Sequence, residues 1–163
     1  MTNEELIREL SAARQQIVQL EQSVSSHLQA EETLKNSEMQ FRSIFDDLAD
    51  ALHVVDGDMR ILFKNKVFSQ WAHLLGMKAA KGKTIFEAFP FLPPELRKEY
   101  ETVFQRGEVL ITEETNTVGG KKYYTETQKI PVFEGKKVAR VITIVRDVTE
   151  RKQADEALQK SEE

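Results

Sequence analysis

The stretch LHVVDGDMRILFKN, residues 52–65, decides the fold. It holds two short apolar runs, Leu52–Asp56 and Arg60–Lys64, and the pair Gly57-Asp58 between them is a turn signal. Two such runs joined by a short turn form a β-hairpin. Asn65 follows at once, and its side chain can accept hydrogen bonds from the free amides at the start of a helix. The stretch therefore predicts a hairpin that runs directly into a helix.

Several short helices are expected after this hairpin. The first covers Lys66 to Leu75, and Gly76 is its expected C-terminal stop. Residues 77–92 indicate short helical turns. Pro93-Pro94 then begins another helix, which Gly107 ends. The helices thus form an insert between the second and third strands.

Three strand candidates follow the insert, at residues 108–117, 121–132 and 137–147, with glycine turns between them. The last is rich in Val and Ile and is expected at the centre of the sheet. Pro131 cannot donate to a strand ladder, so its strand should lie at an edge or be bulged there. A βαβ repeat does not fit this order. The predicted fold class is α+β, with one five-stranded antiparallel sheet and short helices grouped on one face.

The first 50 residues contain no Gly and no Pro and have helical composition. Thr2 and Glu5 form a capping-box pattern at the start. Apolar residues then alternate four and three apart, which buries a stripe only against another helix, and we expect a parallel homodimer. Polar residues on the continued stripe predict a stutter or break near residues 27–38. The seam consists of Leu6, Leu10, Ala13, Ile17, Leu20 and Val24.

The two ends of the chain resemble each other. Residues 29–38 and 153–162 match at six of ten positions when aligned without gaps. One copy leads into the globular part and the other leaves it, which is typical of a tandem array whose parent continues. The expected organisation is an N-terminal coiled-coil helix at 1–36, a globular domain at 37–150 and a C-terminal signalling helix at 151–163.

Composition excludes several functions. The formal net charge is −4 and the basic residues are scattered, so nucleic acid is not an expected partner. The chain has no Cys, which removes disulfides, thiolate metal sites and a Cys nucleophile. No run approaches the roughly 20 apolar residues that span a bilayer, and the N-terminus is too polar for a signal peptide. We expect a cytoplasmic location and no membrane contact by this segment.

Catalytic motifs are missing as well. There is no Walker loop, no other Gly-rich nucleotide-binding region and no GGDEF-like run. The three histidines, His27, His53 and His73, lack the spacing of a metal site, and none has the context of a phosphoacceptor. We expect no metal site and no enzymatic activity in this chain by itself.

Four segments in the right order resemble the PAS superfamily. Residues 37–48 are similar to the helix that enters many PAS domains, and residues 50–56 resemble the first strand. Residues 63–68 resemble the second strand and the Asn that begins the next helix. Residues 146–152, RDVTERK, resemble the closing Asp-Ile-Thr motif, with Val148 in place of Ile. The resemblance covers roughly residues 37–152.

This resemblance implies a sensory module. PAS domains enclose a pocket, sense small molecules, cofactors, light or redox state, and signal through flanking coiled coils to an output domain. The expected parent is a sensor histidine kinase of a two-component system. The alternative is an unliganded dimerisation and relay segment of a diguanylate cyclase or transcription regulator, because a fold does not define a function.

The family also bears on cofactors. Light sensors of the LOV type need a Cys near the Asn65 helix, and none is present. Haem-binding relatives carry a His on the helix before the third strand, and residues 95–106 contain none. The leading expectation is no bound cofactor, while a small apolar ligand or non-covalent flavin stays open, with Trp71 as a stacking partner.

Apolar residues throughout the insert and the last strand are the candidates for a pocket wall, and equally for a plain core. Tyr123, Tyr124 and Thr127 are candidates for polar groups. The apolar candidates are Phe63, Phe68, Trp71, Leu75, Ile85, Phe86, Phe89, Leu96, Tyr100, Phe104, Ile142 and Ile144.

The end of the last strand is the candidate for signal transmission. Asp147 or Thr149 can cap the exit helix and bond strand backbone. We expect Arg151 or Lys152 to pair with Asp147 or with an acidic group near Asp56. A pocket event would then shift the sheet and reorient the helix. The candidate residues are Asp147, Val148, Thr149 and Arg151.

Overall fold

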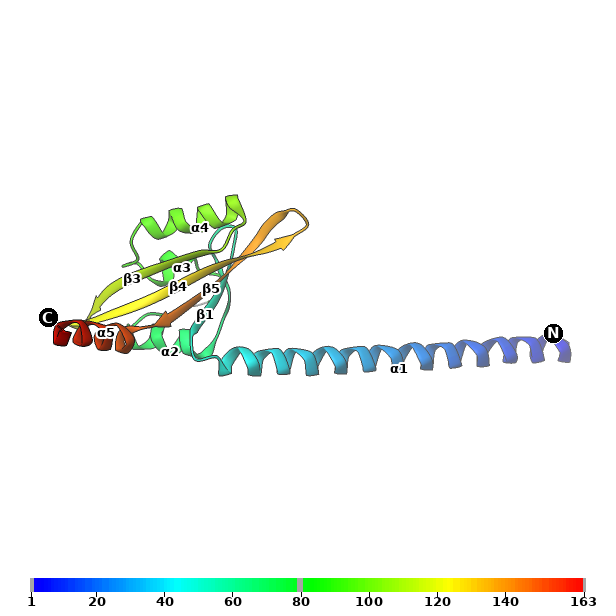
Figure 1. Ribbon diagram of the computed structural model, residues 1–163. Helices are drawn as coiled ribbons and strands as arrows, with labels where there is room; N and C mark the ends of the chain where they lie inside the picture. The colour runs from blue at the N-terminus through cyan, green and yellow to red at the C-terminus, as the bar shows by residue number, and fades with distance from the viewer. Residues whose placement is uncertain (1, 79–80, 163) are drawn as a thin grey trace. The chain divides into compact units, whose positions relative to one another are not determined.

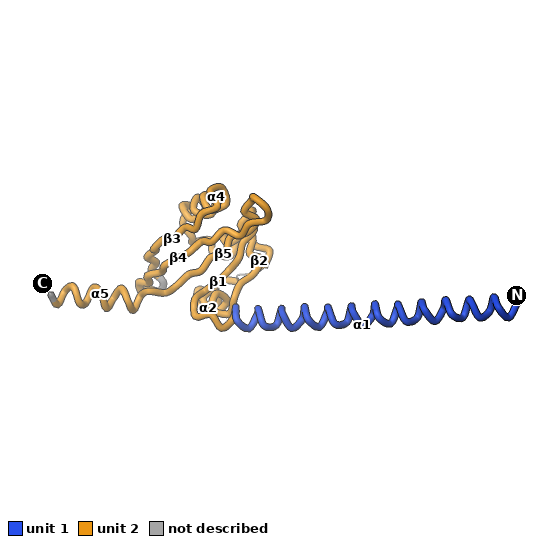
Figure 2. Tube along the Cα trace, turned by 45° about the vertical axis from the view of Figure 1, so that its right-hand side comes forward, with its two compact units in different colours: residues 1–45 blue, residues 46–163 orange. Residues whose placement is uncertain are grey.

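The computed structural model describes residues 2–78 and 81–162 and divides the chain into two compact units, residues 1–45 and 46–163 (Figure 2). Helix α1 (Asn3–Asp47) is one continuous helix of 45 residues. The capping box is confirmed: the Thr2 amide donates to Glu5 Oε2 over 2.8 Å, and the Glu5 amide donates to Thr2 Oγ1 over 3.4 Å. Of the predicted stutter or break near residues 27–38, the break is wrong, while a stutter, which would leave the helix continuous, stays a prediction. Polar residues weaken a seam toward a partner, but they leave the backbone hydrogen bonds of the helix intact.

The hairpin is confirmed as β1 (Ala51–Asp56) and β2 (Ile61–Lys64). Its turn is organised by one carboxylate, because Asp56 Oδ1 accepts from the amides of Asp58 and Arg60, both at 2.9 Å. Met59 takes a left-handed conformation, with φ of 64°, so that the chain can reverse here.

Three helices follow: α2 (Lys66–Leu74), α3 (Ile85–Ala88) and α4 (Glu95–Arg106). The predicted start of α2 at Asn65 is confirmed, and so is the end of α4 at Gly107, whose φ is 64°. Within the predicted helical turns of 77–92, α3 is the helix, and residues 79 and 80 lie outside the described residues.

The remaining strands are β3 (Leu110–Val118), β4 (Lys121–Glu134) and β5 (Lys137–Asp147), and the exit helix is α5 (Thr149–Glu162). The sheet order is β2-β1-β5-β4-β3, with every neighbouring pair antiparallel. The predicted α+β class and the central place of the last strand are confirmed.

Pro131 lies in β4, which has neighbours on both sides in the sheet order. The pairing with β3 ends where Lys129 meets Leu110, so one side of β4 is unpaired beyond that point. The pairing with β5 shifts register between Val132 and Phe133. The proline therefore sits next to a bulge, in a stretch of β4 that pairs with β5 on one side only, which suits a residue without an amide donor.

Two helices cover the sheet at different strands. Helix α2 packs beside β1, and α4 packs beside β4 and β5 (Figure 1). The core between them includes Val55, Phe68, Tyr100 and Val141, each at most 6% exposed. No helix in the part of the chain that the structure describes is long and apolar enough to cross a membrane.

A buried asparagine joins the elements around the hairpin. Asn65 Oδ1 accepts from the amides of Leu52 and Phe68, at 2.9 and 3.0 Å, and its Nδ2 donates to the carbonyl of Asp50 at 2.9 Å. The side chain is 1% exposed. One residue thus caps α2 and also holds the start of β1.

Replacing Asn65 by Ala should lower the free energy of unfolding by about 3 kcal/mol, because a cap is lost and buried backbone groups lose their partners. Thr84→Ala is the matched control, since Thr84 caps the short α3 at a more exposed site. Its cost should be about 1 kcal/mol. Urea unfolding of both variants measures the difference, and equal losses would contradict the structural role of Asn65.

Candidate functional site

A cavity of about 520 Å³ lies between the sheet and helices α2, α3 and α4. Its size is that of a small-molecule site. Aromatic side chains from several elements form much of its wall. Seven of the predicted pocket residues line it, and these are Phe68, Trp71, Leu75, Ile85, Phe89, Leu96 and Tyr100.

The other five predicted residues lie elsewhere. On β5, Thr143 and Val145 line the cavity, so Ile142 and Ile144 point to the opposite face of the sheet. The prediction followed hydrophobicity, which does not show which face of a strand lines the cavity. Three aromatic residues are also placed outside the wall: Phe63 is 44% exposed below Lys81, Phe86 lies under the guanidinium of Arg97, and Phe104 is half-buried on α4.

Polar side chains form one part of the wall, and two of them, His53 and Thr143, were not assigned to the pocket by the sequence analysis. His53 Nε2 is 2.9 Å from the hydroxyl of Tyr100, and that hydroxyl is 2.8 Å from Thr143 Oγ1. All three residues are at most 3% exposed. Of the polar candidates from the sequence, Tyr123 and Thr127 line the cavity and Tyr124 does not. The alternation of β1 and β5 was the available signal, because it places His53 and Thr143 on one face.

A fully buried lysine belongs to the same region. The Lys129 side chain is 0% exposed, and its Nζ lies 2.7 Å from Glu99 Oε2. The ammonium also sits 5.3 Å from the centre of the Tyr100 ring. Glu114, which lines the cavity too, has its pKa raised, chiefly by burial. A buried ammonium is stable only with such partners, because burial removes its hydration.

His53 is held in its neutral form. Burial, and secondly the charge of Lys129, lower its pKa from 6.5 to about 3. Its Nδ1 is buried and has no hydrogen-bond partner among the described residues. Burial also raises the pKa of Tyr100, so its hydroxyl stays protonated and can donate. The polar wall therefore offers neutral hydrogen-bonding groups beside one paired ammonium.

The exit of the domain begins at the rim of this cavity. Asp147 lines the cavity, and its Oδ1 accepts from the amide of Thr149 at 2.9 Å. Thr149 Oγ1 in turn accepts from the amide of Tyr124 at 3.0 Å, and the Val148 amide donates to the Tyr124 carbonyl at 2.9 Å. The start of α5 is thus bonded both to a cavity residue and to β4.

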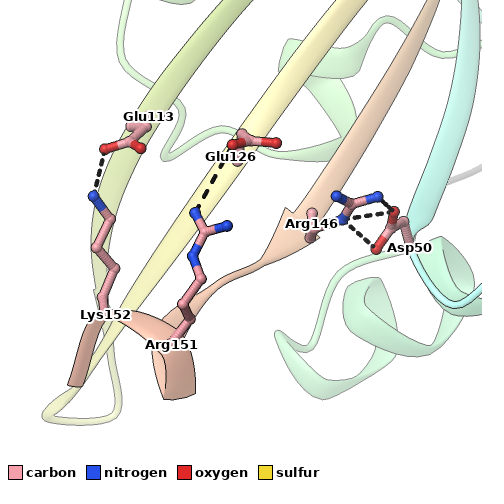
Figure 3. Close-up of polar contacts among 6 residues, drawn as sticks. All are labelled: Asp50, Glu113, Glu126, Arg146, Arg151 and Lys152. Carbon is pink, nitrogen blue, oxygen red and sulfur yellow. Dashed lines mark hydrogen bonds and ion pairs between the residues drawn. The ribbon is translucent and has the colours of Figure 1, made fainter. Parts of the chain in front are cut away.

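Three ion pairs surround this exit (Figure 3). Arg146 pairs with Asp50 at 2.8 Å, Lys152 with Glu113 at 2.8 Å, and Arg151 with Glu126 at 4.0 Å. The prediction that Arg151 or Lys152 pairs with Asp147 or with an acidic group near Asp56 is wrong. The first turn of α5 faces the strand carboxylates of β3 and β4, while Asp147 is engaged as a cap. The Arg146 pair joins the last strand to the residue that precedes β1.

Comparison with known proteins identifies the family. A family model described as the PAS fold matches residues 45–153, and the chain belongs to this family. A search of curated protein sequences gave no significant match.

Solved structures share this fold at low identity. A sensory box sensor histidine kinase from Vibrio cholerae is 22% identical over 73% of this chain and 95% of its own, with a TM-score of 0.50. The PAS domain of BvgS from Bordetella pertussis is 23% identical over 80% and 98%, with a TM-score of 0.55. VqmA bound to DPO is 19% identical over 67% and 57%, with a TM-score of 0.56.

Among the described residues, His53 is the only histidine that lines the cavity, and its Nε2 lies 2.9 Å from the Tyr100 hydroxyl. No group of three His, Cys, Asp or Glu residues within 2–78 and 81–162 could hold a metal ion.

The depressed pKa of His53 predicts a pH-dependent stability. Below about pH 6.5 the His53 side chain takes up a proton in the unfolded chain. In the folded chain it stays neutral until the pH approaches its lowered pKa of about 3. The free energy of unfolding should therefore fall by about 1.4 kcal/mol per pH unit from this residue as pH drops from 6 to 4. Urea unfolding of wild type and His53→Phe at several pH values measures the difference in slope.

The variant keeps a ring in the core, and Thr143 remains a partner for Tyr100. Exposed carboxylates titrate alike in both proteins and cancel in the comparison. Parallel stability curves for the two proteins between pH 6 and pH 4 would contradict the assignment of His53.

Proposed function

We propose that this chain is a PAS sensor module that binds a small molecule in the 520 Å³ cavity and passes the change to an output domain through α5. One observation carries the proposal: Asp147 lines the cavity and also caps the first turn of α5. A ligand that moves Asp147 must disturb this cap. The module itself is proposed to be non-catalytic and to work in the cytosol.

The contacts that would carry the proposed signal extend from Asp147 and α5 into the sheet. Thr149 is 6% exposed and bonds to Tyr124 on β4, while Lys152 reaches Glu113 on β3. The exit helix thus has contacts with two strands whose residues also line the cavity, among them Glu114 and Thr125. A shift of these strands would change the direction of α5.

A sensor histidine kinase is the proposed parent. Support comes from the fold, which the kinase from Vibrio cholerae shares over most of its solved chain. The alternative, a relay segment of a diguanylate cyclase or transcription regulator, gains support from the likeness to VqmA bound to DPO. In either case the proposed partner in the parent is a further domain after α5.

The second proposed partner is another copy of the chain. Five of the six seam residues are large apolar side chains, and each is at least 40% exposed in the single chain. A stripe of this kind is stabilised by a parallel partner helix. A parallel dimer would supply two copies of the module to a symmetric output.

Native mass spectrometry of the purified chain tests the proposal. We expect the mass of a dimer, with extra mass that disappears from a denatured spectrum. An ultraviolet–visible scan of the same sample identifies a chromophore if the molecule is a flavin. A clean dimer without added mass in native spectra, even from crude lysate, would favour the unliganded relay instead.

The dimer itself has a matched pair of variants. Ile17 lies on the seam and Val18 beside it does not, although the two are 53% and 50% exposed. Ile17→Glu should therefore give a monomer and Val18→Glu a dimer. A dimer with both variants would contradict the seam.

The relay is tested by hydrogen exchange. Exchange at the start of α5 should differ between the protein as purified and the protein stripped by unfolding and refolding. In Asp147→Ala the Thr149 amide has lost its acceptor, so exchange should be fast in both states and the difference should vanish. A difference as large as in wild type would show that Asp147 takes no part.

A further inference from the structure

The charges around the cavity restrict what the cavity can bind. Lys129 is the ammonium in its wall, and Glu99 already balances it at 2.7 Å. Glu114 and Asp147 also line the cavity; burial raises the pKa of Glu114, and Asp147 accepts a hydrogen bond from the Thr149 amide at the rim. An anionic ligand would compete with these carboxylates, and a cationic ligand would approach Lys129, so either charge would be buried at a cost. The wall therefore favours an uncharged molecule.

Two buried groups nevertheless have hydrogen-bonding capacity to spare. An ammonium has three N–H donors, and the hydrogen bond of Lys129 to Glu99 uses one of them. Within the part of the chain that the structure describes, His53 Nδ1 is buried without a partner, whichever ring nitrogen carries the proton. Both residues are at least nine-tenths buried and both line the cavity. Leaving such groups unpaired costs free energy that a polar ligand atom recovers.

The rest of the wall is aromatic. Phe68 and Phe89 meet edge to face with ring centres 5.4 Å apart, and Trp71 borders the same space. Such side chains favour a flat ring as a partner. A cavity of roughly 150 Å³ holds benzene. By the same scale, 520 Å³ holds a molecule of up to roughly 20 non-hydrogen atoms.

We propose that the cavity binds an uncharged aromatic or heteroaromatic molecule whose carbonyl oxygen or ring nitrogen accepts a hydrogen bond from Lys129, with His53 as the second polar contact. Glu99 acts as the selectivity residue, because it supplies the negative charge that a carboxylate ligand would otherwise bring. This inference rests on the proposed function of the cavity and adds the chemical class of the ligand.

Three probes of one shape separate the classes. They are 4-fluoroacetophenone, which is neutral with a carbonyl acceptor, 4-fluorobenzoate, which is an anion, and 4-fluorobenzylamine, which is a cation at neutral pH. Fluorine NMR line broadening with the full chain, stripped of any bound molecule, gives their relative affinities. We expect the ketone to bind at least about tenfold more tightly than either ion.

Two variants assign the effect to residues. Lys129→Met removes the donor at similar length and should weaken the ketone by about tenfold, whereas Lys136→Met, an exposed control on the β4–β5 turn, should change nothing. Glu99→Gln leaves Lys129 without its counterion and should reverse the order, so that 4-fluorobenzoate becomes the tightest probe. Circular dichroism checks that each variant is folded, and the wild-type probe order stands as a test even if Lys129→Met does not fold.

The outcomes distinguish this inference from the proposed function. Tightest binding of 4-fluorobenzoate or 4-fluorobenzylamine to wild type would overturn the ligand class while leaving a ligand-binding sensor. An unchanged probe order in Glu99→Gln would overturn the role of Glu99. Failure of all three probes to bind, with no mass added in native spectra, would overturn the sensor function as well.

Discussion

The hydrogen bonds of one buried asparagine organise this domain. Asn65 joins the amide of Leu52, the amide of Phe68 and the carbonyl of Asp50, and so ties the first strand to the first helix of the insert. A buried backbone group must have a partner, and here a single side chain supplies three. Because β1 pairs with the central strand β5, the position of α2 against the whole sheet depends on this junction. The cavity depends on this junction as well, because Phe68 and Trp71 of α2 form part of the cavity wall.

The second constraint is the burial of four polar side chains in a small core. A core of apolar residues alone would avoid the free-energy cost of removing these groups from water. Lys129, His53, Tyr100 and Thr143 are all at most 3% exposed. They compensate for one another only in part, because His53 Nδ1 has no partner among the described residues. An apolar replacement would remove the cost of burying an ion pair. These groups line the cavity that the proposed ligand would occupy, and Asp147, which caps α5, lines the same cavity.

Local patterns in the sequence predicted much of this architecture. The Gly57-Asp58 turn, the Asn65 cap and the Gly107 stop each depend on residues within a few positions, and the structure has all three. The residues of the candidate site were harder to predict from the sequence. Ile142 and Ile144 were chosen because they are apolar, yet the central strand turns Thr143 toward the cavity. Arg151 and Lys152 were expected to pair with nearby or hairpin carboxylates, and instead they reach Glu126 and Glu113 on other strands.

The sequence by itself determined the α+β class, the PAS resemblance, the capped helices and the place of the Val- and Ile-rich strand, because these follow from propensity, turn chemistry and alternation within short segments. Only the tertiary structure decided which face of each strand lines the cavity and which charges meet. His53, Tyr100, Lys129 and Thr143 come from three strands and a helix, and Lys129 meets Glu99 across 30 positions in the chain. Their contacts depend on strand order and register, which arise from packing the whole sheet against its helices and leave no local pattern in the sequence.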